Sequence, residues 1–292
     1  DKSPRSFTVL LSIILKGLEY IFRYYILILI RIDLMNIPHV PVLYNETLKA
    51  FEDINDGYII DCTTGYAGHS NGLLEQNENI KLICNDQDDE ALAFSANRLE
   101  DYKDRVTFNK GNFETVMQSF KDYDIQGILA DIGVSSLQLD KEDRGFGFNS
   151  EVLDMRMDQN QALDASIVVN TYSQTDLERV LKEYGEVREY KKVASIIMNN
   201  RPFSSARELS ELLSKKMYKG KIHPATLPFQ GIRIEVNDEL GVLERLFDSI
   251  EEIKPKNCTV AIISFHSLED RIVKNYFKKG SKSCICPKEA FR

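Results

Sequence analysis

Residues 131–140 combine carboxylates, a glycine, two hydroxyls and an amide directly after an apolar run, residues 125–130. Such a run is typical of a buried strand, and α/β proteins bind ligands at the carboxyl ends of parallel strands. There Asp131 is placed to accept a hydrogen bond, with the hydroxyls of Ser135 and Ser136 close by. An ordinary strand end, in which Ser135 or Ser136 caps the next helix, is the alternative. Taken alone, the segment favours that alternative, so an active site depends on the surrounding sequence.

A second polar turn, residues 61–70, also follows an apolar run. Gly65 and Gly68 permit a sharp turn and close approach of a ligand, and the amides at a helix N-terminus attract anions. About twenty residues further on, Asp86 ends another apolar run, where a carboxylate can accept hydrogen bonds from ribose hydroxyls. Two ordinary turns beside a solvated acidic cluster are the alternative. We interpret the pair as a nucleoside site, which suits nicotinamide cofactors and S-adenosylmethionine alike.

A regular alternation of strands and helices positions these turns. The predicted strands are 58–62, 80–85, 106–108 and 127–130, and the predicted helices are 70–76, 88–99 and 113–120. Strands alternating with helices indicate the α/β class with a doubly wound, parallel sheet.

The alternation then stops for about ninety residues. Helical patterns occupy 175–184, 191–200 and 205–216, where Ser204 or Ser205 is a candidate N-cap and Glu208 is placed for a capping box. The sheet pattern resumes with a helix at 237–253, a strand at 259–265 and a helix at 267–279. We therefore predict a discontinuous domain, 35–142 and 223–292, interrupted by a helical, substrate-binding subdomain, 143–222.

Composition sets broad limits. A chain of 292 residues that is 43% hydrophobic can bury one large core or two smaller ones, and its net charge of -8 does not decide for or against a nucleic-acid partner. Three of the five cysteines lie in apolar runs, which is typical of a reduced, cytoplasmic protein. Cys284 and Cys286 could form half of a metal site, but no second pair follows, so no metal is predicted.

Residues 1–34 do not share the globular pattern. Their apolar runs are interrupted by Lys16, Glu19 and Arg23 and fall short of the ~20 residues that span a bilayer. A membrane-surface helix is one interpretation. The simpler one, which we prefer, is a non-native or leader extension before a natural start at Met35.

Eight motifs occur in one order along the rest of the chain. They are PHVPVL (38–43), GYAGHS (65–70), residues 131–140, RGFGF (144–148), LDMRMD (153–158), HPAT (223–226), FQGIRI followed by Val236-Asn237, and ISFHSLEDR (263–271). Together they resemble the MraW family, the ribosomal RNA small subunit methyltransferase H enzymes of bacteria, from His39 to about Arg292. The resemblance implies transfer of a methyl group from S-adenosyl-L-methionine to N4 of a decoding-region cytidine in 16S rRNA.

The resemblance also implies the site residues and a class I, Rossmann-like methyltransferase domain. The cofactor contacts carried over are Ala67, Gly68, His69, Asp86, Phe113, Asp131 and Gln138. The chain departs from the family at Ala67, where Gly is usual, and at Leu137, where Pro is usual. Asp86 would hold the ribose and Phe113 would pack on adenine, although an aromatic residue at a helix start is more often core.

For catalysis, the exocyclic amine of cytosine is a poor nucleophile because its lone pair is delocalised into the ring. We expect Asp131, with Ser135 or Ser136 nearby, to accept a hydrogen bond from N4–H while the methyl group is transferred.

The candidate substrate contacts are Arg144, Phe146, Phe148 and His266. Arginine can grip phosphate and aromatic rings can stack on bases, but a loop packed on the insertion and a structural histidine are the alternatives. Basic residues supply a candidate RNA surface: Arg201, Arg207, Lys215, Lys216, Lys219, Lys221, Lys278, Lys279 and Lys282. A solvated charged face explains them equally well.

The expected partner is 16S rRNA, free or in the small ribosomal subunit, with a possible homodimer and no stable membrane partner. A nicotinamide-dependent dehydrogenase is an alternative, because it would use the same glycine turn and Asp86. A non-catalytic RNA-binding or membrane-tethered module is another, favoured if residues 1–34 are native.

Overall fold

The computed structural model describes residues 41–135, 138–139, 141–217 and 221–281. It divides into two compact units. Of these residues, 41–86, Leu92–Gly133 and 247–281 form the sheet unit, and Gln87–Ala91 and the described part of Val134–Leu246 form the helical unit. The predicted extension, residues 1–34, lies outside the described residues.

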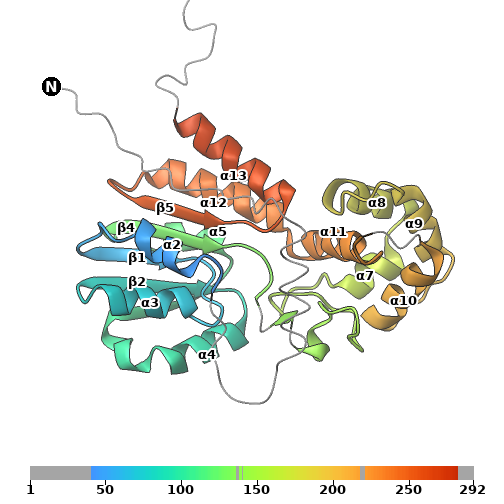
Figure 1. Ribbon diagram of the computed structural model, residues 1–292, viewed down its shortest axis with the longest axis horizontal. Helices are drawn as coiled ribbons and strands as arrows, with labels where there is room; N and C mark the ends of the chain where they lie inside the picture. The colour runs from blue at the N-terminus through green and yellow to red at the C-terminus, as the bar shows by residue number, and fades with distance from the viewer. Residues whose placement is uncertain (1–40, 136–137, 140, 218–220, 282–292) are drawn as a thin grey trace, which may run out of the picture. The chain divides into compact units, whose positions relative to one another are not determined.

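The sheet unit contains a five-stranded parallel sheet with the order β3-β2-β1-β4-β5 (Figure 1). The strands are β1 (Gly57–Asp61), β2 (Ile80–Asp86), β3 (Val106–Lys110), β4 (Ile125–Asp131) and β5 (Thr259–Ile263). Its helices are α2 (Tyr44–Ala50), α3 (Gly68–Gln76), α4 (Asp89–Arg98) from Leu92 onward, the 3-10 helix η1 (Glu100–Arg105), α5 (Phe113–Ser119), the second half of α12 (Glu239–Ile253) and α13 (Ser267–Gly280). The α/β class and the parallel sheet predicted from the sequence are confirmed.

The apolar runs form the inner strands because both faces of a parallel sheet are covered. Ile59, Leu82 and Leu129, on β1, β2 and β4, have no exposed surface and belong to the same core as Leu73 of α3. The order of strands changes direction at β1, so the two neighbours of β1, β2 and β4, are reached by crossovers of opposite direction. In open α/β sheets this switch point is where ligands bind.

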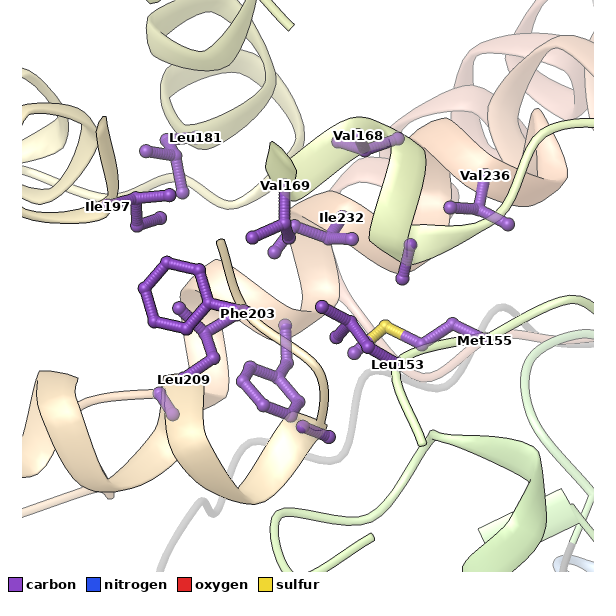
Figure 2. Packing of buried hydrophobic residues seen from close by; sticks show 14 of the residues in the cluster. Leu153, Met155, Val168, Val169, Leu181, Ile197, Phe203, Leu209, Ile232 and Val236 are labelled. Atoms are coloured by element: carbon purple, nitrogen blue, oxygen red, sulfur yellow. The ribbon is translucent and has the colours of Figure 1, made fainter. Parts of the chain in front are cut away.

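The helical unit has its own core (Figure 2). Its elements are η2 (Glu142–Arg144), α7 (Ala165–Thr171), α8 (Gln174–Arg179), the π-helix η3 (Val180–Tyr184), α9 (Tyr190–Met198), α10 (Ala206–Lys216), α11 (Thr226–Asn237) and the first half of α12 (Glu239–Ile253). Figure 2 shows Val169, Leu153 and Ile232, from separate segments, pointing toward one another. The predicted N-cap of α10 is Ser205, which accepts from Glu208 N at 3.1 Å, while the Glu208 carboxylate accepts from Ser204 N.

The boundaries of the helical unit differ from those predicted. The structure groups Gln87–Ala91, the described residues of 134–142 and residues 223–246 with it, and Ile232 and Val236 of α11 are buried in its core. At Gly231 an added Cβ would lie 2.8 Å from the backbone nitrogen of Gly185, so α11 approaches the end of η3 very closely. A glycine there weakens the helical pattern, and α11 was not predicted.

Other differences are local. Helices α2 and α7 were not predicted, and the helix predicted at 175–184 is α8 followed by the π-helix η3. Strand β5 ends at Ile263, two residues earlier than predicted. None of the helices in the described part of the chain has both the length and the apolar character needed to cross a membrane.

Candidate active site

Three neighbouring strands of the sheet unit each end on an aspartate. Asp61, Asp86 and Asp131 are the last residues of β1, β2 and β4. The carboxyl ends of parallel strands share one edge of the sheet, so three carboxylates are gathered at the switch point. This arrangement is the core of the candidate site.

Asp61 is a buried positioning residue. Its carboxylate accepts from Ser70 Oγ at 2.6 Å and from Thr63 N at 3.2 Å. Burial raises the pKa of Asp61, and the hydrogen bond from Ser70 opposes this only in part. Thr63 in turn holds the end of β4, since its Oγ1 accepts from Asp131 N at 2.7 Å. Neither Asp61 nor Thr63 was predicted as a site residue.

The turn after β1 connects to the end of β2. Asp86 Oδ2 accepts from Gly65 N at 2.8 Å, which fixes the carboxylate against the turn. Gly65 and Ala67 have φ values of 50° and 54°, in the left-handed region that favours glycine. At Gly68 an added Cβ would lie 2.3 Å from Pro41 Cγ, so only glycine fits. Ala67 therefore occupies a backbone conformation that a glycine would adopt without strain.

His69 and Asp131 form a largely buried pair beside this turn. His69 is 5% exposed, and its Nε2 lies 3.6 Å from Asp131 Oδ2. Among the described residues, neither ring nitrogen of His69 nor Oδ1 of Asp131 has a hydrogen-bond partner. Buried polar atoms in native proteins are almost always satisfied. These three atoms therefore indicate a place where a ligand supplies the missing donors and acceptors.

The side-chain amide of Asn85 is buried and fixes the loop between β3 and α5. Asn85 Nδ2 donates to the carbonyls of Cys62 and Gly111, both at 3.0 Å. Phe113, 9% exposed, then begins α5. Asn85 was not predicted, although an asparagine at the end of an otherwise apolar strand was a usable signal.

Gln138 lies in the helical unit and is 4% exposed. Its Nε2 donates to Asp88 Oδ2 at 3.1 Å, and its Oε1 accepts from Ser135 N at 3.1 Å. The hydroxyl of Ser135 accepts from Gln138 N at 3.3 Å. Ser136 and Leu137 lie outside the described residues. The structure therefore gives Gln138 and Ser135 a mutual bracing role, and their contacts with cofactor and substrate stay predictions.

Arg144 is also buried in the helical unit, with 2% exposure. Its guanidinium lies 2.8 Å from Asp88 Oδ2 and 2.9 Å from Glu90 Oε2, and it donates to two backbone carbonyls. The hydrogen bond from Lys141, followed by both nearby cations, lowers the pKa of Glu90. This is the packed-loop alternative, and a grip of Arg144 on phosphate has no support in its surroundings.

The remaining predicted substrate contacts have structural partners too. Phe146 is 7% exposed in the core of the helical unit, and Phe148 stacks on His223 with ring centroids 4.6 Å apart. His266 is the N-cap of α13, where its Nδ1 accepts from Glu269 N in a capping box. Roles in substrate binding for these three residues stay predictions.

Several side chains of the predicted basic surface have hydrogen-bond or ion-pair partners within the protein. Arg201 donates to the carbonyl of Val169, and Arg207 pairs with Glu151. Lys215 is 73% exposed and pairs with Glu211 within one helical turn. Lys219 and Lys282 lie outside the described residues, as do Cys284 and Cys286.

A doubly wound parallel sheet with acidic strand ends and a glycine turn between β1 and α3 defines a Rossmann-like fold, a class that binds nucleoside cofactors at this edge of the sheet. Within that class, the family model described as the MraW methylase family matches residues 36–291, and the chain belongs to this family. The predicted family resemblance is confirmed.

Curated relatives agree with this assignment. A protein of Aliarcobacter butzleri is 77% identical over 258 residues, covering 88% of this chain and 86% of the relative. Relatives of Sulfurimonas denitrificans and Campylobacter jejuni are 60% and 50% identical, each over 264 residues, covering 89% and 88% of this chain and 86% and 85% of the relatives. All three are named "Ribosomal RNA small subunit methyltransferase H".

Proposed function

We propose that this chain transfers a methyl group from S-adenosyl-L-methionine to the exocyclic N4 of a decoding-region cytidine in 16S rRNA. Membership of the MraW methylase family and the names of the relatives support a small-subunit rRNA substrate. The observation that carries the chemistry is the pair of His69 and Asp131 at the carboxyl edge of the sheet, which has buried polar atoms without a hydrogen-bond partner in the part of the chain that the structure describes.

The residues of the sheet unit fit this cofactor. The Asp86 carboxylate, fixed by Gly65 N, is placed to accept hydrogen bonds from ribose hydroxyls. Phe113 would supply an apolar face for adenine, and the buried ring nitrogens of His69 would exchange hydrogen bonds with the polar methionine end. In the helical unit, the Gln138 amide is the further predicted contact. When bound, the cofactor supplies an electrophilic methyl group on a sulfonium centre.

Asp131 would act on the cytidine amine. Its Oδ1 has no partner among the described residues, so it can accept a hydrogen bond from N4–H. This bond keeps electron density on the nitrogen and orients the amine as the new N–C bond forms. The extra proton leaves the nitrogen after transfer. His69, 3.6 Å from the second carboxylate oxygen, would hold the carboxylate in place, and a hydroxyl of Ser135 or Ser136 would assist.

Transfer of a deuterated methyl group tests this proposal. Purified protein is incubated with CD₃-labelled S-adenosylmethionine and small ribosomal subunits lacking the modification, and the rRNA is digested to nucleosides for mass spectrometry. Labelled N4-methylcytidine is the expected product, and labelled 5-methylcytidine or 2′-O-methylcytidine alone would contradict the proposal.

The role of Asp131 is tested by Asp131→Asn, with the exposed Asp122→Asn as a matched control in the same unit. The variant at Asp131 is expected to lose methyl transfer far more than cofactor affinity, while the control keeps both. Unchanged turnover in Asp131→Asn would remove Asp131 from the chemistry.

The cellular location and the form of the rRNA substrate are further parts of the proposed function. The enzyme would act in the cytoplasm, on 16S rRNA that is free or assembled in the small subunit. Parallel reactions with naked 16S rRNA and with intact small subunits decide between these substrates. Light scattering of the purified chain tests whether it forms a homodimer.

A further inference from the structure

The side chain of Phe265 is exposed at the carboxyl edge of the sheet unit. Strand β5 ends at Ile263, so Phe265 lies in the link between β5 and α13. Its exposed fraction is 51%, which is the highest among the large hydrophobic side chains in the described residues. Isolated exposed hydrophobic side chains are common, so exposure alone does not indicate a binding contact. The position of the Phe265 ring beside the candidate site is the informative observation.

The backbone of Phe265 is held firmly. Its N–H donates to Glu269 Oε2 at 2.9 Å, and Glu269 is fully buried in the first turn of α13. His266 and Glu269 form the capping box of the same helix. The ring is therefore presented to solvent from a fixed point at a helix start. Such support is what a precise binding contact requires.

The ring also lies next to the strand that carries Asp131. Asp131 and Ile263 are register partners on β4 and β5, and Ile132 N donates to Ile263 O at 2.9 Å. Gly133 has a φ of 119°, and a Cβ added there would lie 3.3 Å from Phe265 Cδ2. The edge of the ring thus rests on the backbone two residues beyond Asp131.

We propose that Phe265 is the platform on which the target cytosine stacks while its amine faces Asp131. This inference rests on the proposed function. Proteins commonly hold a base that has left its RNA context by stacking it on an aromatic side chain. Phe146 and Phe148, the rings that the sequence suggested for this task, are packed within the helical unit, whereas Phe265 is exposed beside the strand end that carries the acid.

A single introduced fluorophore tests stacking directly, because the chain contains no tryptophan. Phe265→Trp places the reporter at the proposed platform. Phe108→Trp is the matched control, since Phe108 is 37% exposed on β3, at the opposite edge of the sheet. A transcript of the 16S rRNA decoding region, added with S-adenosylhomocysteine, is expected to quench the first variant saturably and leave the second unchanged. Quenching by S-adenosylhomocysteine alone would show that the ring contacts the cofactor, and would overturn the proposal.

Kinetics give the second readout. Phe265→Ala is expected to raise the KM for rRNA by about 5- to 150-fold, the factor equivalent to the ~1–3 kcal/mol of one base–aromatic stack. Phe265→Tyr is expected to restore it, Phe265→Leu is not, and affinity for S-adenosylhomocysteine stays constant in all three. An unchanged KM in Phe265→Ala would refute the platform. Quenching of Phe265→Trp by RNA without formation of N4-methylcytidine would leave the platform standing and refute the proposed reaction instead.

Discussion

Replacement of Arg144 by Met tests the conclusion that this arginine stabilises the helical unit. The guanidinium and its partner Asp88 are 2% and 3% exposed at their side chains and lie 2.8 Å apart. The substitution keeps most of the side-chain volume but leaves the Asp88 carboxylate buried without this cation. Two backbone carbonyls, of Arg156 and Met157, also lose a donor.

The expected loss in the free energy of unfolding is about 3–5 kcal/mol, the usual cost of removing one partner from a buried ion pair. The second pair, with Glu90, adds little because that carboxylate is 40% exposed and contacts with solvent-exposed charges contribute at most about 1 kcal/mol. Arg207→Met is the matched control, since Arg207 is 41% exposed and pairs with Glu151. Its expected loss is below about 1 kcal/mol.

Urea unfolding followed by circular dichroism measures these differences. Asp88→Asn and the double variant Arg144→Met/Asp88→Asn complete a double-mutant cycle. The double variant should be less destabilised than the sum of the two single variants, because no uncompensated charge remains buried. Wild-type stability in Arg144→Met together with weakened RNA binding would refute the structural role and restore the phosphate contact suggested by the sequence.

Three further predictions concern the sheet unit. Burial raises the pKa of Asp61 above the ordinary value of 3.8. Between 3.8 and the native pKa, the folded protein therefore keeps a proton that the unfolded chain has released. The free energy of unfolding should fall as the pH rises through this range, by at most about 1.4 kcal/mol per pH unit. Urea unfolding of Asp61→Asn between about pH 4 and 8 should lack this slope, and a slope equal to that of the wild type would contradict the shift. Burial raises the pKa of Cys84 and of Cys258 to about 12, so iodoacetamide at roughly pH 8 should alkylate them about a thousandfold more slowly in the native protein than in urea, measured by peptide mass spectrometry. Equal rates would contradict the raised pKa values of these two thiols. Ala67→Gly relieves a left-handed residue and should raise the melting temperature slightly, by the equivalent of up to about 1 kcal/mol, whereas a lower value would contradict the strain.

The sequence predicted the architecture of the sheet unit well because its strands are short apolar runs that end at polar residues. The positions of Asp86 and Asp131 at strand ends were predictable for that reason, since a carboxylate directly after a buried strand marks the edge of the sheet where ligands bind. The boundary of the helical unit was less predictable. Gly231 interrupts the helical pattern of α11, and which core Ile232 joins depends on tertiary packing.

The surroundings of the predicted substrate contacts could not be read from the sequence. Arg144 and Phe146 were chosen by residue type, but burial and ion pairing decide what such side chains do, and these depend on residues distant in sequence such as Asp88. Phe265 was assigned to the end of a strand, because an apolar residue after an apolar run continues the pattern. In the structure β5 ends at Ile263, and Phe265, two residues later, has an exposed ring.

The central claim, methylation of a cytidine N4 in 16S rRNA, is tested most directly in a strain from which the gene for this chain has been deleted. Mass spectrometry of nuclease fragments of its 16S rRNA compares the decoding region with that of the parent strain and of the deletion strain complemented with wild type or Asp131→Asn. The proposed function predicts loss of one N4-methyl group, restored by the wild type and not by the variant. An unchanged set of N4-methylcytidines in the deletion strain would contradict it.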